Sequence, residues 1–121
     1  MVLVAACGNN NTETTKEKTE DAKEAASGDV TANPDYEKGL ALVSSSDCFT
    51  CHKVTEKLVG PAYQEVADKY AGSDTAVTYL AHKIIHGGSG VWGNVAMTPH
   101  PQLSLDSAEA MVKYILLLKN Q

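Results

Sequence analysis

Large apolar side chains are nearly absent from the amino-terminal part of the sequence. Between Gly8 and Asn33 the only such residue is Val30, and Asn, Thr, Glu, Lys, Ala and Ser dominate. A segment of this composition buries too little apolar surface to offset the entropy lost on ordering. We therefore expect residues 8–33 to form a disordered linker and residues 34–121 to form one folded domain.

Clusters of basic residues and long apolar runs are also absent. The net charge is −5, with three lysines and six acidic residues in 8–33 and seven lysines and nine acidic residues in 34–121. Without a basic patch, nothing indicates nucleic-acid binding. No apolar run approaches the roughly 20 residues that span a bilayer as a helix.

Alternation of apolar and polar residues, which is typical of strands, is absent as well. Apolar residues instead recur at helical spacing, which predicts an all-α domain with one long loop, 87–104. Asn33 before Pro34 is typical of a helix start, and Asp106 with Glu109 predicts a capping box. The predicted helices cover residues 34–44, 62–71, 74–86 and 105–119.

The chain has three cysteines, and two of them belong to the string Cys48-Phe49-Thr50-Cys51-His52. Two thiols separated by two residues and followed by a histidine form the attachment pattern of a c-type haem. The thiols add to the vinyl groups of the porphyrin, and His52 supplies a neutral imidazole nitrogen to the iron. A covalently held haem c would also enlarge the core of a small domain.

The second iron ligand is expected in the loop 87–104, where Met97 is followed by Thr98 and Pro99. A thioether sulfur is a soft, neutral ligand that favours reduced iron. Proline stiffens the loop that holds this weak ligand. Met111 lies on the apolar stripe of the last predicted helix, so we expect it to fill the core.

The third cysteine, Cys7, follows the short apolar run Val2–Ala6. This pattern resembles the end of a bacterial lipoprotein signal, in which Cys7 becomes the lipidated first residue. We therefore expect a signal remnant in residues 1–7 and a lipid anchor at the periplasmic or extracytoplasmic face of a bacterial membrane. Attachment of a c-type haem independently requires export. The alternative is a free thiol near a frayed chain end.

The chain from Cys48 to Lys119 resembles the short bacterial class I c-type cytochromes, the cytochrome c-551/c-552 group. The matching motifs are CFTCH at 48–52, LVGPAYQEVADKYAG at 58–72, GSGVWG at 88–93 and MTP at 97–99. The resemblance implies the class I cytochrome c fold, with about four helices wrapped around one covalently attached haem. It also implies a monohaem electron carrier and not an enzyme.

The resemblance further assigns roles to single residues. It implies that His52 and Met97 are the axial ligands, and that the carbonyl of Pro61 accepts a hydrogen bond from the other ring nitrogen of His52. It implies that Trp92 donates its indole N–H to a haem propionate. The alternative for Trp92 is simple packing on the haem edge.

The resemblance also implies a close helix crossing, and this chain departs from the group at one position near the ligand methionine. Gly39 and Tyr114 occupy positions where the first and last helices of the group cross closely. Members often carry an asparagine three residues after the ligand methionine, hydrogen-bonded to its sulfur, whereas this chain has His100 there. The change leaves the tuning of the potential open. It also raises the alternative that His100 competes as a ligand in the oxidised state. Lys83 stands where a longer cation often reaches a propionate.

Other chemistries could use some of these residues. A zinc site of two cysteines and two histidines could be formed by Cys48, Cys51, His82 and His86. Its two pairs are 30 residues apart, which is wrong for a compact zinc finger. A thiol–disulfide oxidoreductase would place its cysteines beside a βαβ unit. A haem enzyme or gas sensor would need an open distal position, against which Met97 argues.

We therefore expect a monomeric carrier that passes single electrons between respiratory partners, such as a quinol-oxidising complex, a terminal oxidase or a reductase. The linker 8–33 would span roughly 28 Å as a flexible chain, which keeps the domain near membrane partners. The alternative is a fixed haem subunit of a membrane respiratory complex, whose sign would be a large exposed apolar patch.

Overall fold

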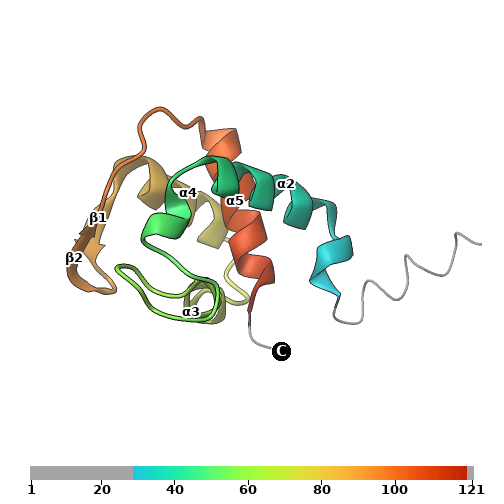
Figure 1. Ribbon diagram of the computed structural model, residues 1–121, viewed down its shortest axis with the longest axis horizontal. Coiled ribbons are helices and arrows are strands. Elements are labelled where there is room, and N and C mark those ends of the chain that lie inside the picture. The colour runs from blue at the N-terminus through green and yellow to red at the C-terminus, as the bar shows by residue number, and fades with distance from the viewer. Residues whose placement is uncertain (1–28, 120–121) are drawn as a thin grey trace, which may run out of the picture.

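The computed structural model describes residues 29–119 and shows a mainly helical domain with one small sheet (Figure 1). The four predicted α-helices are present, which confirms the fold class. The predicted signal remnant with Cys7 and most of the predicted linker lie outside the described residues. The elements are η2 (Val30–Ala32), α2 (Pro34–Ser45), η3 (Cys48–Thr50), α3 (Tyr63–Lys69), α4 (Ala76–His86), β1 (Gly88–Gly90), β2 (Gly93–Met97) and α5 (Leu105–Leu117).

Helix α2 starts at Pro34, as the sequence predicts. The side-chain oxygen of Asn33 accepts a hydrogen bond from the backbone N–H of Asp35 at 2.9 Å. Pro34 follows as the first helical residue, where its missing N–H costs nothing. The short turn η2, in the last residues of the predicted linker, leads directly into this cap.

Helix α5 also starts at the predicted residue, but its cap differs from the prediction. Ser104 has an extended backbone and its Oγ accepts from the N–H of Ser107 at 3.1 Å. The predicted capping box of Asp106 and Glu109 is therefore wrong, because Asp106 already lies inside the helix. Glu109 instead accepts a hydrogen bond from Thr78 Oγ1 at 3.0 Å, which joins α4 to α5.

Helices α2 and α5 pack side by side and cross at Gly39 (Figure 1). A Cβ atom at Gly39 would overlap the side chain of Tyr114 and lie 2.5 Å from the carbonyl oxygen of Ala110. Tyr114 is buried, and its ring meets that of Tyr36 edge to face with the centroids 5.2 Å apart. The close crossing expected at Gly39 and Tyr114 is thus present.

Helix α5 is the centre of the core and contacts α2, α3 and α4. Where α4 meets α5, small side chains are fully buried, which lets the two helices approach closely. Met111 is 1% exposed, so its prediction as a core residue is confirmed. The buried residues of the larger cluster are Val43, Tyr63, Val66, Met111, Tyr114 and Ile115.

The predicted loop 87–104 contains a two-stranded antiparallel hairpin, β1–β2, which the sequence did not indicate. Gly88 pairs with Met97 and Gly90 pairs with Gly93. All of β1 and most of β2 are exposed, so no buried face imposes the alternation that sequence patterns detect. Among residues 29–119, no helix is both long and apolar enough to cross a membrane.

Candidate functional site

The string 48–52 winds into a single tight turn. The carbonyl oxygen of Cys48 accepts hydrogen bonds from the N–H groups of Cys51 at 3.1 Å and of His52 at 3.0 Å. This turn brings both cysteines to the wall of one cavity, together with the histidine. Both thiols are free and half-buried. They are therefore placed to react with a single ligand held in that cavity.

His52 is held in a fixed orientation by groups on three sides. Its Nδ1 lies 2.8 Å from the carbonyl oxygen of Pro61. Since a carbonyl only accepts hydrogen bonds, Nδ1 carries the proton, and Nε2 is left with a lone pair for a metal. The ring stacks on Tyr63, with centroids 5.2 Å apart and planes 19° from parallel. The contact with Pro61 that the resemblance implies is present.

Gly60 closes the third side of His52, and sequence reasoning overlooked it. A Cβ atom at this position would overlap the imidazole carbon Cε1 and lie 2.8 Å from Nδ1. Gly60 is also fixed by its own backbone, because its N–H donates to the carbonyl of Cys51 at 2.7 Å and its carbonyl accepts from Leu58 at 3.1 Å. The sequence signal that could have identified Gly60 was its place directly before Pro61 in the motif LVGPA.

All six predicted site residues line one cavity of about 350 Å³. The cavity brings together the turn 48–52, the loop before α3, and the hairpin. Its deeper walls are apolar side chains from α2, α3, α4 and α5, which suits a large apolar group. The predicted site residues on its wall are Cys48, Cys51, His52, Pro61, Trp92 and Met97.

Met97 is the last residue of β2 and is half-buried at the cavity wall. Its backbone passes directly over Gly87, which has φ +68°. A Cβ atom at Gly87 would overlap the carbonyl of Met97 and lie 2.9 Å from the backbone nitrogen of Pro99. Glycine at the end of α4 therefore allows the methionine loop to lie close against the helix.

Trp92 lies in the turn between β1 and β2 and is 38% exposed. The Nζ atom of Lys69 is 5.5 Å from its ring centroid, a distance suited to a cation–π contact. Lys83, another cavity residue, has its Nζ 5.6 Å from the ring centroid of Tyr79. Of the two lysines, Lys83 lines the cavity, together with Lys57 and the acidic residues Asp47 and Glu65. The roles of Trp92 and Lys83 toward a propionate stay predictions.

Burial shapes the electrostatics of the inner wall. It raises the pKa of the Cys48 thiol, with a smaller contribution from the negative charge of Asp47. Burial also raises the pKa of Tyr63 far above that of a free phenol, with the neighbouring Cys48 adding to the effect. Tyr63 thus stays a neutral hydroxyl beside His52.

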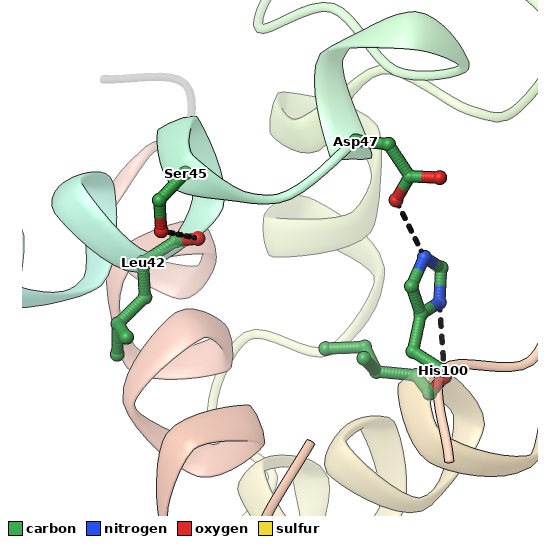
Figure 2. Close-up of polar contacts among 5 residues, drawn as sticks. Leu42, Ser45, Asp47 and His100 are labelled. Carbon is green, nitrogen blue, oxygen red and sulfur yellow. Dashed lines mark hydrogen bonds and ion pairs between the residues drawn. The ribbon is translucent and has the colours of Figure 1, made fainter. Parts of the chain in front are cut away.

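His100 is buried, with 8% of its surface exposed, and lies against the cavity wall. Its Nε2 is 2.7 Å from Oδ1 of Asp47, and its Nδ1 is 3.3 Å from the carbonyl oxygen of Ile84. Figure 2 shows the imidazole ring pointing at the Asp47 carboxylate. Both ring nitrogens are engaged by these oxygens, which opposes the alternative that His100 competes as a ligand. Asp47 was overlooked in the sequence.

The histidines of the zinc alternative do not join the cysteines. His82 and His86 are exposed on α4 and stack on each other, with ring centroids 5.7 Å apart. Within residues 29–119, no three or more histidine, cysteine or acidic side chains gather in a group that could hold a metal ion. The geometry therefore supports the haem pattern over zinc.

Residues 36–119 match the family model described as cytochrome c. The chain is 47% identical over 78 residues to cytochrome c-552 of Nitrosomonas europaea, covering 64% of this chain and 76% of that protein. It is 39% identical over 87 residues to cytochrome c-551 of Allochromatium vinosum, covering 72% of this chain and 93% of the other.

Solved structures show the same likeness. The crystal structure of wild-type Nitrosomonas europaea cytochrome c552 matches with a TM-score of 0.63 and 46% identity, over 66% of this chain and 99% of that one. The class 1 cytochrome MtoD of Sideroxydans lithotrophicus matches with a TM-score of 0.59 and 27% identity, over 69% and 96% of the two chains.

Proposed function

The chain belongs to the cytochrome c family, and from that premise we propose that it passes single electrons between respiratory partners in the cell envelope. It is a small class I monohaem c-type cytochrome, a kind of protein that carries electrons. Haem c, bound covalently through Cys48 and Cys51, supplies the one-electron couple of its iron. The observation that carries the proposal is the single cavity that gathers all six predicted site residues.

In this proposal His52 and Met97 would hold the haem iron. The Pro61 carbonyl fixes the proton of His52 on Nδ1, so that the lone pair of Nε2 would be available to the iron. Met97 is brought to the same cavity by the hairpin and by its close packing over Gly87. Two neutral ligands in an apolar wall would favour the reduced iron and raise its potential.

The rim of the cavity suits transient contact with redox partners. Several large apolar side chains on the rim are exposed, which favours short-lived docking of an apolar edge. A quinol-oxidising complex, a terminal oxidase or a reductase would dock here. The same rim would suit the alternative of a fixed subunit of a membrane respiratory complex. The exposed large apolar residues of the cavity are Val59 (51%), Tyr79 (40%), Val91 (47%), Trp92 (38%) and Val95 (64%).

The proposed location is the periplasmic or extracytoplasmic side of a bacterial membrane, with a monomeric domain tethered by a lipid on Cys7. Support comes from the sequence alone, since Cys7 and residues 8–28 lie outside the described part of the chain. The haem attachment motif itself calls for export. Mass spectrometry of the mature protein from a bacterial host would detect the lipid on Cys7 directly.

The visible spectrum of protein produced with a c-type maturation system tests the ligand assignment. We expect a sharp α-band in the reduced form and a weak methionine–iron band in the oxidised form. Met97→Ala should keep the haem covalently attached, lose the methionine–iron band and bind carbon monoxide rapidly when reduced. The matched control is Met111→Leu, which changes the buried methionine of the same cavity wall. An unchanged spectrum in Met97→Ala would show that Met97 is not the ligand.

A further inference from the structure

His100 joins three parts of the chain that are distant in sequence. Its backbone N–H donates to the carbonyls of Ile84 at 3.0 Å and Ile85 at 3.1 Å, in the last turn of α4. Its own carbonyl accepts from Leu103 at 3.1 Å, which turns the chain toward α5. Its side chain reaches Asp47, just before the haem-binding cysteines. The residue thus anchors the loop that follows Met97.

The ring of His100 has oxygen acceptors at both nitrogens. A backbone carbonyl and a carboxylate can only accept hydrogen bonds. Nε2 therefore donates to Asp47 across the short 2.7 Å contact, and the second ring nitrogen, 3.3 Å from the Ile84 carbonyl, donates as well when the ring is cationic. With only 10% of its side chain exposed, the ring has little access to competing water.

The side chain of Asp47 makes no cap hydrogen bond in the turn that Asp47 begins, although the residue occupies the N-cap position of η3. The carboxylate extends instead toward His100, while nearby Ser45 bonds back to the carbonyl of Leu42 at 3.0 Å (Figure 2). The hydrogen bond from His100 and its charge lower the pKa of Asp47, so the carboxylate is ionised at neutral pH.

We infer that the Asp47–His100 pair is a positioning element for the distal ligand Met97. The pair fastens the loop three residues beyond Met97 to the residue that precedes Cys48. This one hydrogen bond thereby fixes the position of the Met97 loop relative to the turn that begins at Cys48. Loss of the pair frees the loop after Met97, and the sulfur then leaves the iron more often. This inference rests on the proposed ligation by His52 and Met97.

The rate at which external imidazole replaces Met97 tests the inference, because imidazole enters the oxidised holoprotein only when the sulfur has left. Asp47→Ala is the main variant, since Asp47 is exposed and lies outside the core, so its removal leaves no cavity. We expect imidazole to bind about five- to tenfold faster, the factor for one charged hydrogen bond that is partly screened by solvent. Asp47→Asn, which keeps an acceptor oxygen, should restore part of the slow rate.

Thr78→Val is the matched control. It removes a 3.0 Å hydrogen bond that also joins two elements, α4 and α5, but touches neither Met97 nor its loop. We expect this variant to bind imidazole at the wild-type rate. Guanidinium unfolding of each holoprotein gives the stability change, against which the rates are compared.

Three results would overturn the inference. Asp47→Ala with a wild-type imidazole rate would show that the pair does not restrain the loop. If imidazole bound faster to both Asp47→Ala and Thr78→Val, in proportion to their loss of stability, the effect would come from a general destabilisation of the fold. A wild-type oxidised spectrum without the methionine–iron band would refute the assignment of Met97 itself. This last result is seen in the wild-type protein before any variant is made. A failure of the Met97 assignment is therefore distinguished from a failure of the Asp47–His100 inference.

Discussion

The substitution Gly60→Ala adds one methyl group beside the predicted proximal ligand. The new Cβ would overlap Cε1 of His52 and lie 2.8 Å from Nδ1 and 3.0 Å from Nε2. The backbone at residue 60 cannot withdraw easily, because it is hydrogen-bonded to Cys51 at 2.7 Å and to Leu58 at 3.1 Å. The imidazole must therefore move, and it loses its alignment with the Pro61 carbonyl.

The size of the effect follows from three contributions. Losing the hydrogen bond between His52 and Pro61 costs about 1 kcal/mol. Forcing a methyl group into a closely packed site costs about 1–3 kcal/mol. Replacing glycine by alanine restricts the unfolded chain, which stabilises the folded protein by about 0.4–1 kcal/mol. We therefore expect the holoprotein to lose about 2 kcal/mol of unfolding free energy.

Guanidinium unfolding of the haem-loaded protein measures this loss, and redox titration reports the ligand. Gly60→Ala should also shift the reduction potential, because the displaced imidazole binds the iron less well. The control is Gly72→Ala, whose Cβ would meet no atom within 4 Å but whose φ is +77°. That variant should lose about 1–2 kcal/mol through backbone strain and keep the wild-type potential. A Gly60→Ala protein with wild-type stability and potential would refute the reasoning.

Two further predictions concern stability. Gly39→Ala should destabilise the protein by about 2 kcal/mol in guanidinium unfolding, because the methyl group would push against Tyr114 and the Ala110 carbonyl; wild-type stability would contradict the close helix crossing. The lowered pKa of Asp47 means that its stabilising effect is present above the ordinary value of 3.8 and disappears as the pH falls through the lower folded value. The unfolding free energy of wild type relative to Asp47→Asn should therefore fall as the pH drops below 3.8; a difference that does not change on acidification would contradict this.

The sequence predicted the local features of this site well because their causes are local. The five residues 48–52 form their own turn, and Pro61 reaches His52 from nine residues away. Helix starts such as Asn33-Pro34 depend on neighbouring side chains only. The resemblance to a known group added the contact of Pro61 with His52 and the predicted role of Trp92, which no spacing rule supplies.

Features that depend on how distant segments meet could not be predicted in the same way. The hairpin β1–β2 is exposed, so it has no apolar alternation to reveal it. The capping box at Asp106 was wrong because Ser104, two residues earlier, satisfies the first turn of α5. The crowding at Gly60 depends on the ring position of His52, which is visible only once the loop has folded.

The orientation of His100 shows how a departure from the family pattern is accommodated by a residue distant in sequence. An asparagine at this position is expected to bond the methionine sulfur, which is a weak acceptor. The imidazole of His100 has a stronger acceptor within reach, the ionised Asp47 at 2.7 Å, and charge-assisted hydrogen bonds are roughly twice as strong as neutral ones. The ring therefore turns to Asp47, 53 residues away in sequence, and holds Met97 through the backbone between them. Replacing either residue alone leaves the other without the partner that gives it this role.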